Sequence, residues 1–167
     1  MNRLLQAIES ISDGMAYISA IALGLMTLLI LLEIFLWNVF ETTTLIADEY
    51  AAYGLAAIIF WGAGFCLKEK GHIRITLILG FLPPRLSRIV TWIGTVVAML
   101  FSGYLWWFLF KMTLAAFRYG STSGTLTHTP LWIPQGIMLL GATGFSFQLV
   151  AAAVKTFRSI QSGDDVF

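Results

Sequence analysis

The sequence predicts an all-α integral membrane protein with four transmembrane helices in one domain that covers residues 1–167. Of its residues, 58% are hydrophobic and only 11% are charged, which leaves too little polar surface for a water-soluble globule. Four apolar stretches are long enough to cross a bilayer, because about 20 helical residues match a hydrocarbon core of about 30 Å. Glu33 is the one charged residue within them. The stretches cover approximately residues 14–40, 50–67, 89–110 and 129–154.

The residues before the first span predict a short amphipathic helix on the membrane surface. Apolar residues recur there at helical spacing among charged ones, at Leu4, Leu5, Ile8 and Ile11. The uncharged run that follows, residues 14–32, is longer than the apolar core of about 7–15 residues in a cleaved signal peptide. We therefore expect the first span to remain in the mature protein.

The positions of lysine and arginine predict the orientation, because cytoplasmic loops retain these residues. Eight of the ten lie before the first span, between the second and third spans, or after the fourth. The connection between spans one and two has none, and the connection between spans three and four has only Lys111 and Arg118. We expect both termini and the middle connection to be cytoplasmic.

The connection between spans two and three is too apolar to extend into water and too interrupted to span. We expect Pro83 and Pro84 to stop a helix there. The segment at about residues 71–86 is therefore predicted to be amphipathic and to lie in the cytoplasmic interface, or to pack against a partner protein.

The connection between spans three and four has two parts. Glycine and hydroxyl residues dominate residues 120–129 and favour turns. Pro130 and Pro134 then flank an apolar triplet that contains Trp132, and tryptophan is favoured at interfacial depth. We expect an ordered outer edge with a mobile lip.

Small residues predict where helices approach closely. They recur every four residues in spans one and three, at Ala16, Ala20, Gly24, Gly94, Ala98 and Ser102. Such faces suit packing within the bundle or docking against a second membrane subunit. Glu33, near the outer end of span one, could reach water or headgroups, contact a neighbouring helix, or take part in ion coupling.

Several function classes are not expected. His72 and His128 are predicted on opposite sides of the membrane, so they cannot share a metal or form a catalytic pair. Cys66 is the single cysteine, which excludes an internal disulfide. The cations sit next to membrane spans, where topology explains them better than nucleic-acid binding does. We expect neither an enzyme nor a cofactor.

A set of short motifs follows a definite order along the chain. Asp48 and Glu49 precede span two, Gly62-Ala63-Gly64 lies within it, and residues 68–75 follow it. Leu82-Pro83 and residues 129–134 complete the pattern. In this order and topology the chain resembles the small membrane subunit of tripartite ATP-independent periplasmic (TRAP) transporters, the DctQ-like family.

The resemblance implies a multi-pass subunit of the bacterial inner membrane. A large multi-spanning subunit would carry the substrate and sodium sites, and a soluble periplasmic protein would capture an organic acid such as a dicarboxylate or sialic acid. The chain itself would be a scaffold that pairs with the large subunit, contacts membrane lipids and helps to form the periplasmic docking platform.

The resemblance also implies site residues. Candidate contacts with the large subunit are Asp48, Glu49, His72 and Arg74, with Glu33 as a further polar candidate. The acidic pair also suits the N-terminus of a helix. The candidate edge for the binding protein comprises Thr129, Pro130, Trp132 and Pro134. The chain departs from the family at Glu33, near which members often carry an arginine, and at Thr76, where an aspartate is common.

Two other functions stay open at this point. The chain could be a self-sufficient homo-oligomeric exporter or channel built around Glu33, or a membrane anchor for an enzyme or redox complex. The lack of an intramembrane histidine argues against haem ligation in the second case. The uniform spans, with no evident internal repeat, argue against a transporter that acts alone.

Overall fold

The computed structural model describes residues 2–69 and 83–162. These residues form four helices, α1 (Asn2–Phe40), α2 (Ala47–Lys68), α4 (Pro84–Tyr119) and α5 (Trp132–Ser162). Each contains a stretch long and apolar enough to cross a membrane, namely Gln6–Phe40, Ala47–Lys68, Ile89–Tyr119 and Trp132–Arg158. The expected all-α class, with four helices long and apolar enough to span a membrane, is confirmed. The orientation of the termini stays a prediction.

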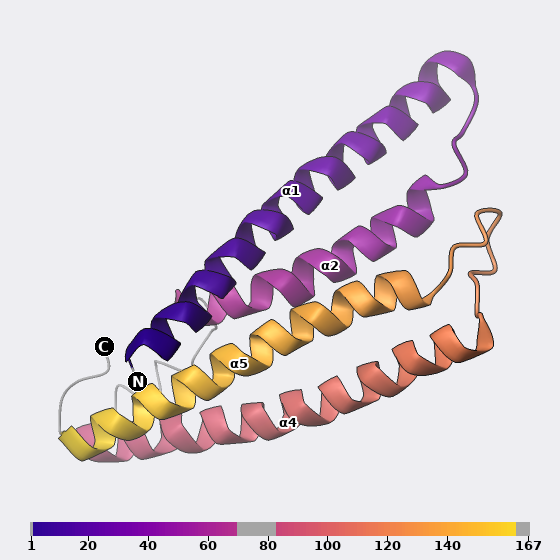
Figure 1. The fold of residues 1–167 in the computed structure, drawn as a ribbon. Coiled ribbons are helices and arrows are strands. Elements are labelled where there is room, and N and C mark those ends of the chain that lie inside the picture. The colour runs from indigo at the N-terminus through magenta and orange to yellow at the C-terminus, as the bar shows by residue number, and fades with distance from the viewer. Residues whose placement is uncertain (1, 70–82, 163–167) are drawn as a thin grey trace.

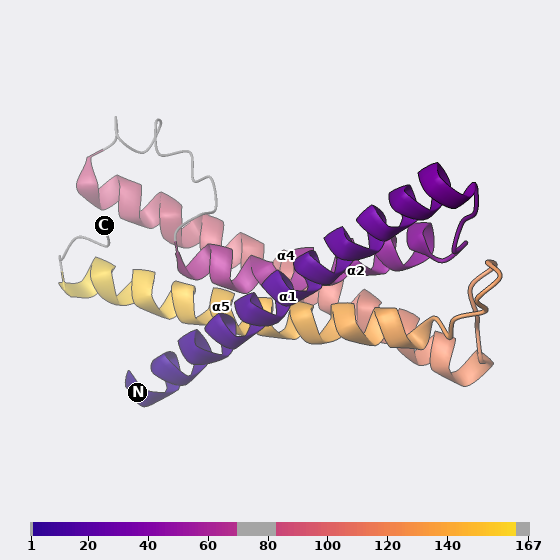
Figure 2. The ribbon, with the colours of Figure 1, turned by 90° about the horizontal axis from the view of Figure 1, so that it is seen from above.

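The helices lie side by side in the order α1, α2, α5, α4 (Figure 1). α5 packs against all three others, and α1 also packs against α2. Seen from above, α1 runs obliquely across α5 (Figure 2). The start of α1 and the end of α5 lie at one end of the bundle, which we call the terminal end. The α1–α2 and α4–α5 connections lie at the other, which we call the loop end.

Several helix boundaries differ from the expected ones. α4 continues to Tyr119, so Lys111 and Arg118 lie on this helix rather than in the connection after it. α1 runs from Asn2 without a break, so the amphipathic N-terminal segment continues the first spanning helix. α4 begins at Pro84, because a proline at the first helical position loses no hydrogen bond and has a helical φ. Residues 84–86 therefore belong to α4, and the rest of the expected interfacial segment lies largely outside the described residues. α5 begins at Trp132, so Thr129 and Pro130 belong to the connection.

Glycines on α5 allow the closest helix contacts. A Cβ added at Gly141 would lie 2.6 Å from Trp61 Cδ1 and 2.8 Å from Phe60 Cβ, both on α2. A Cβ added at Gly144 would lie 2.3 Å from Met15 Sδ on α1. Since helices in lipid associate through close packing rather than hydrophobic burial, these two glycines set the position of α5 in the bundle.

The two expected small-residue faces have different environments. In α1, Ala20 is exposed, and a Cβ at Gly24 would meet nothing within 4 Å, so the face that carries these two residues points away from the bundle. In α4, Gly94 is equally open, whereas Ser102 is buried and its hydroxyl lies 2.9 Å from that of Ser146 on α5. In this row of small residues on α4, Gly94 therefore lies on the exterior of the bundle, and Ser102 lies in the contact between α4 and α5.

Polar side chains link the helices along their length. The Trp61 indole N–H donates to the Ile137 carbonyl at 2.7 Å, and the Trp106 indole N–H donates to the Thr143 hydroxyl at 2.8 Å. Nearer the terminal end, the buried Ser12 hydroxyl donates to the Gln148 side-chain oxygen at 3.2 Å. Such links stabilise a membrane bundle by about 0.6 kcal/mol each.

Candidate functional site

Glu49 joins α2 to the α4–α5 connection at the loop end. It lies in the first turn of α2, and its carboxylate accepts hydrogen bonds from the hydroxyls of Thr125 and Thr127. The Tyr53 hydroxyl, one turn further along α2, donates to the same carboxylate at 2.7 Å. Hydrogen bonds to a charged acceptor are among the stronger ones in proteins. Glu49 therefore holds a loop that lies far from it in the sequence.

The backbone of the α4–α5 connection folds into a narrow hairpin. Gly120 ends α4 with φ 60°, a left-handed conformation that glycine adopts without steric cost. Beyond it, the Leu131 amide donates to the Ser121 carbonyl at 3.0 Å, and the Ser123 amide donates to the Thr129 carbonyl at 2.9 Å. The half that glycine and hydroxyl residues were expected to make mobile is thus held by backbone hydrogen bonds.

The hydroxyl groups of four residues in this hairpin are hydrogen-bonded to one another. Ser123 and Thr125 share a hydrogen bond of 2.7 Å, Thr125 and Thr127 one of 2.9 Å, and the Thr129 hydroxyl donates to Thr127 at 3.0 Å. These residues alternate in the sequence, and the bends and turns at residues 124–127 bring their hydroxyls together. This alternation is the sequence signal that could have identified the cluster.

Glu33 holds the other connection at the loop end. Its carboxylate accepts from the Thr44 amide at 3.2 Å, from the Thr44 hydroxyl at 2.5 Å, and from the Thr43 hydroxyl. Both threonines follow α1 in the α1–α2 connection. Glu33 is thus bound by the loop that follows its own helix, an arrangement that none of the three expected environments described.

Asp48 and Glu49 have different surroundings although they are adjacent. The N-cap of α2 is Ile46, which makes no side-chain capping hydrogen bond, and both carboxylates lie in the first turn. There they face the positive end of the helix dipole. Asp48 is exposed, and its side chain makes no hydrogen bond or ion pair with any described residue. Glu49 is therefore a hydrogen-bond acceptor within the chain, whereas the charge of Asp48 is available to a partner.

The expected edge for a binding protein is partly exposed. Pro130 and Trp132 are exposed, and the Trp132 ring packs edge-on against Phe117 with ring centroids 5.7 Å apart. Pro134 is buried, and Thr129 points into the hydroxyl cluster. His72 and Arg74, the other expected contacts, lie outside the described residues.

Two ion pairs tie the helices at the terminal end. Lys68 Nζ on α2 lies 2.5 Å from Asp13 Oδ1 on α1, and Lys155 on α5 pairs with Glu9 on α1. The sequence indicated neither pair, because each joins residues on separate helices. Along α1, Asp13 and Glu33 are 20 positions apart, about 30 Å, which matches the hydrocarbon core.

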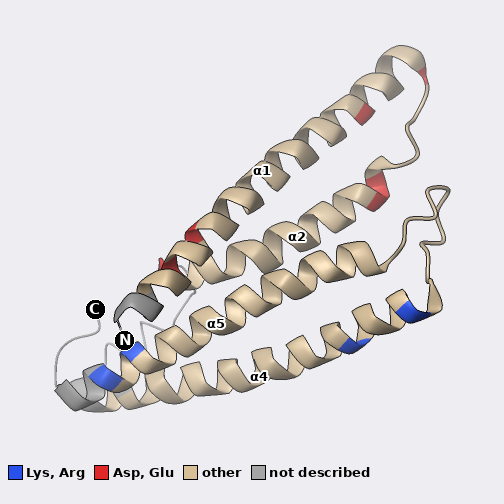
Figure 3. Cartoon of the chain, in the orientation of Figure 1, with Lys and Arg blue, Asp and Glu red and all other residues tan. Residues whose placement is uncertain are grey.

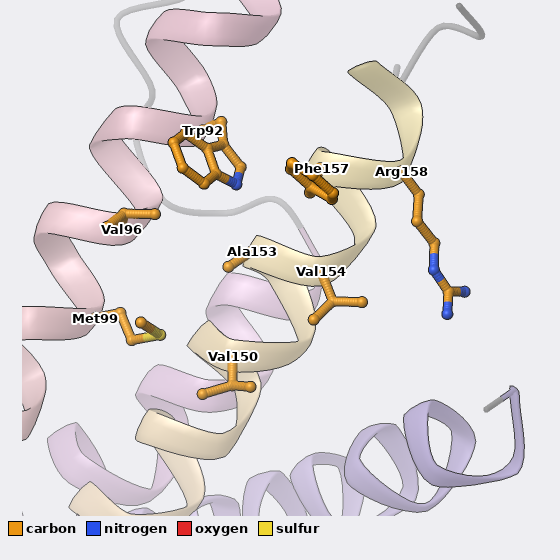
Figure 4. A pocket seen from close by; sticks show the side chains of 8 residues that line it. All are labelled: Trp92, Val96, Met99, Val150, Ala153, Val154, Phe157 and Arg158. Carbon is orange, nitrogen blue, oxygen red and sulfur yellow. The ribbon is translucent and has the colours of Figure 1, made fainter. Parts of the chain in front are cut away.

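A groove of about 530 Å³ lies between α4 and α5 near the terminal end. Its lining comprises Trp92, Val96, Met99, Val150, Ala153, Val154, Phe157 and Arg158. The Arg158 side chain extends away from Trp92 (Figure 4), so the walls between the helices are apolar. Such a surface suits hydrocarbon.

Within the described part of the chain, no three histidine, cysteine, aspartate or glutamate side chains are grouped so that they could hold a metal ion. The hydrogen bonds and ion pairs of Glu49, Glu33, Asp13 and Glu9 instead fix loops and helices in place.

Comparison with known proteins gives one match. A family model described as "Tripartite ATP-independent periplasmic transporters, DctQ component" matches residues 26–159, which include parts of all four helices. No curated protein and no solved structure matches the chain.

Proposed function

Since the chain belongs to the DctQ family, the small membrane component of TRAP transporters, we propose that it is a scaffold subunit that carries no substrate itself. In this proposal it pairs with the large multi-spanning subunit in the bacterial inner membrane, with the terminal end in the cytoplasm. The loop end then forms part of the surface on which the soluble substrate-binding protein docks. A sodium gradient drives uptake of an organic acid through the large subunit.

One observation carries the scaffold role. Some carboxylates and lysines of the spanning helices make polar contacts, and these contacts join them to loops and helices of the same chain. Glu33 and Glu49 hold the two loops, and Asp13 and Glu9 hold lysines on neighbouring helices. A subunit that conducts ions would instead direct such groups toward a path through the membrane.

The same observation weighs against the homo-oligomeric exporter. That function requires Glu33 to exchange ions or protons within the membrane. The two loop threonines occupy its carboxylate, and they tie it to a connection rather than to a neighbouring helix. We therefore assign Glu33 to loop structure.

Reconstitution tests this function. Liposomes that contain the chain alone should show no sodium-driven uptake of sialic acid or of a C4-dicarboxylate. Liposomes with the chain and the large subunit, supplied with the soluble binding protein, should show uptake of the transporter's substrate, and omission of the chain should abolish it. Sodium-driven uptake by the chain alone would refute the scaffold role, as would full uptake without it.

A further inference from the structure

Charges at the loop end are segregated by helix. The acidic residues lie on α1, on α2 and in their connection, at Glu33, Glu41, Asp48 and Glu49. The basic residues, Lys111 and Arg118, both lie on α4, at the opposite side of the bundle (Figure 3). The loop end therefore has an acidic side and a basic side.

The outermost of these charges are available to a partner. Glu41, Asp48 and Arg118 are exposed, and their side chains form no hydrogen bond or ion pair within residues 2–69 and 83–162. Lys111 is also exposed. It stands about two turns deeper on α4, with its ammonium 5.1 Å from the centre of the Trp107 ring. These opposite charges lie on different sides of the surface and are not paired with each other. The surface therefore presents an electric dipole to the aqueous phase.

Both connections at the loop end are held in place by hydrogen bonds. On the acidic side, Glu33 binds Thr43 and Thr44 of the α1–α2 connection. Glu49 binds the hairpin, which starts two residues after Arg118. A fixed separation of charge can orient a partner, whereas charges on mobile loops would average out.

We propose that this segregated surface sets the orientation in which the soluble substrate-binding protein docks. The partner's docking face carries a basic patch that meets Glu41 and Asp48, and an acidic patch that meets Arg118. Long-range attraction of this kind raises the association rate and rejects the reversed orientation. The inference rests on the proposed function, and it adds the charge pattern of the partner.

The test measures association of the transporter's purified binding protein with the two-subunit complex in neutral nanodiscs, at low and high salt. Asp48→Lys and Arg118→Glu should each slow association at low salt by at least about five-fold, and high salt should reduce the difference. Glu69→Lys makes the same charge change at an exposed residue of the terminal end and should leave the rate unchanged. Each variant is measured in complexes that have co-purified with the large subunit, so that a change in rate reports on association with the binding protein.

The possible outcomes distinguish failure of this inference from failure of the proposed function on which it rests. Lack of binding to the unmodified complex would overturn the proposed docking function and this inference with it. Normal binding with unaltered rates in Asp48→Lys and Arg118→Glu would overturn the charge-guided orientation alone. Faster association of either variant would show the opposite charge on the partner, which also contradicts the proposal.

Discussion

The carboxylate of Glu49, in the first turn of α2, accepts a hydrogen bond from the hydroxyl of Thr127, which lies 78 positions later in the chain. The contact joins the start of the second helix to the connection before the last one. It makes the loop end a single unit in which movement of α2 also moves the hairpin.

Replacement of Glu49 should loosen that hairpin. Glu49→Gln keeps the size of the side chain but replaces a charged acceptor of three hydroxyl hydrogen bonds with a neutral amide. Amide hydrogen exchange at Ser123 and Leu131 should become faster. Asp48→Asn is the matched control, and it should leave exchange in the hairpin unchanged. Equal exchange in the two variants would exclude Glu49 as the group that holds the loop.

Replacement of Glu33 should affect the α1–α2 connection and leave ion coupling intact. Glu33→Gln weakens the bonds to Thr43 and Thr44, so amide exchange at Thr44 should increase. Sodium-driven uptake by the reconstituted complex should keep its sodium dependence. A changed ion stoichiometry in this variant would instead support a coupling role.

Gly141→Ala should destabilise the bundle. The new methyl group would lie under 3 Å from Trp61 and from the backbone of Phe60, so α2 and α5 must separate. Overpacking of this kind costs about 1–3 kcal/mol in the free energy of unfolding. Denaturant unfolding in mild detergent measures the change.

Gly94→Ala provides the control for that substitution. A Cβ at Gly94 meets nothing within 4 Å, and alanine favours a helix over glycine. This variant should be at least as stable as the parent protein. A similar loss in both variants would contradict the close α2–α5 contact.

Ser12→Ala should remove a buried link between α1 and α5. The hydroxyl of Ser12, which is 2% exposed, donates to Gln148, which is 3% exposed. The unfolding free energy should fall by about 0.6 kcal/mol, the average measured for side-chain hydrogen bonds in membrane bundles. Thr27→Ala removes an exposed hydroxyl that bonds within its own helix, and should change stability less. The reverse order would show that the Ser12 contact contributes little.

Much of the fold follows from local pattern. Apolar length alone predicts the four spans, because a helix must satisfy its own backbone in lipid and needs about 20 residues to cross. The ends are less predictable. Pro83 and Pro84 were expected to stop a helix, and the segment before them lies outside the described residues. Pro84 itself begins α4, because the same restriction on φ that breaks a helix interior suits its first position. The continuity of α1 through its amphipathic start likewise depends on partners, since Glu9 and Asp13 pair with lysines on α5 and α2.

The candidate site depends more on tertiary contact. The sequence indicated the acidic doublet and the proline-bracketed edge as places of interest, but it did not relate them. Asp48 and Glu49 have the same charge and are adjacent, and only the position of the hairpin decides that Glu49 is bound and Asp48 is available. For the same reason Thr129 and Pro134 turn inward while Pro130 and Trp132 remain exposed.

By itself, then, the amino-acid sequence determined that this protein has four membrane-spanning helices, along with the resemblance to the TRAP small subunit that the family match supports. These properties depend on local composition and on motif order, which need no knowledge of neighbours in space. The tertiary structure decided that α5 packs against all three other helices, that Gly141 and Gly144 lie at its contacts with α2 and α1, and that Glu49 holds the hairpin at the loop end. Those features arise from contacts between residues far apart in the chain, which exist only once the helices have packed.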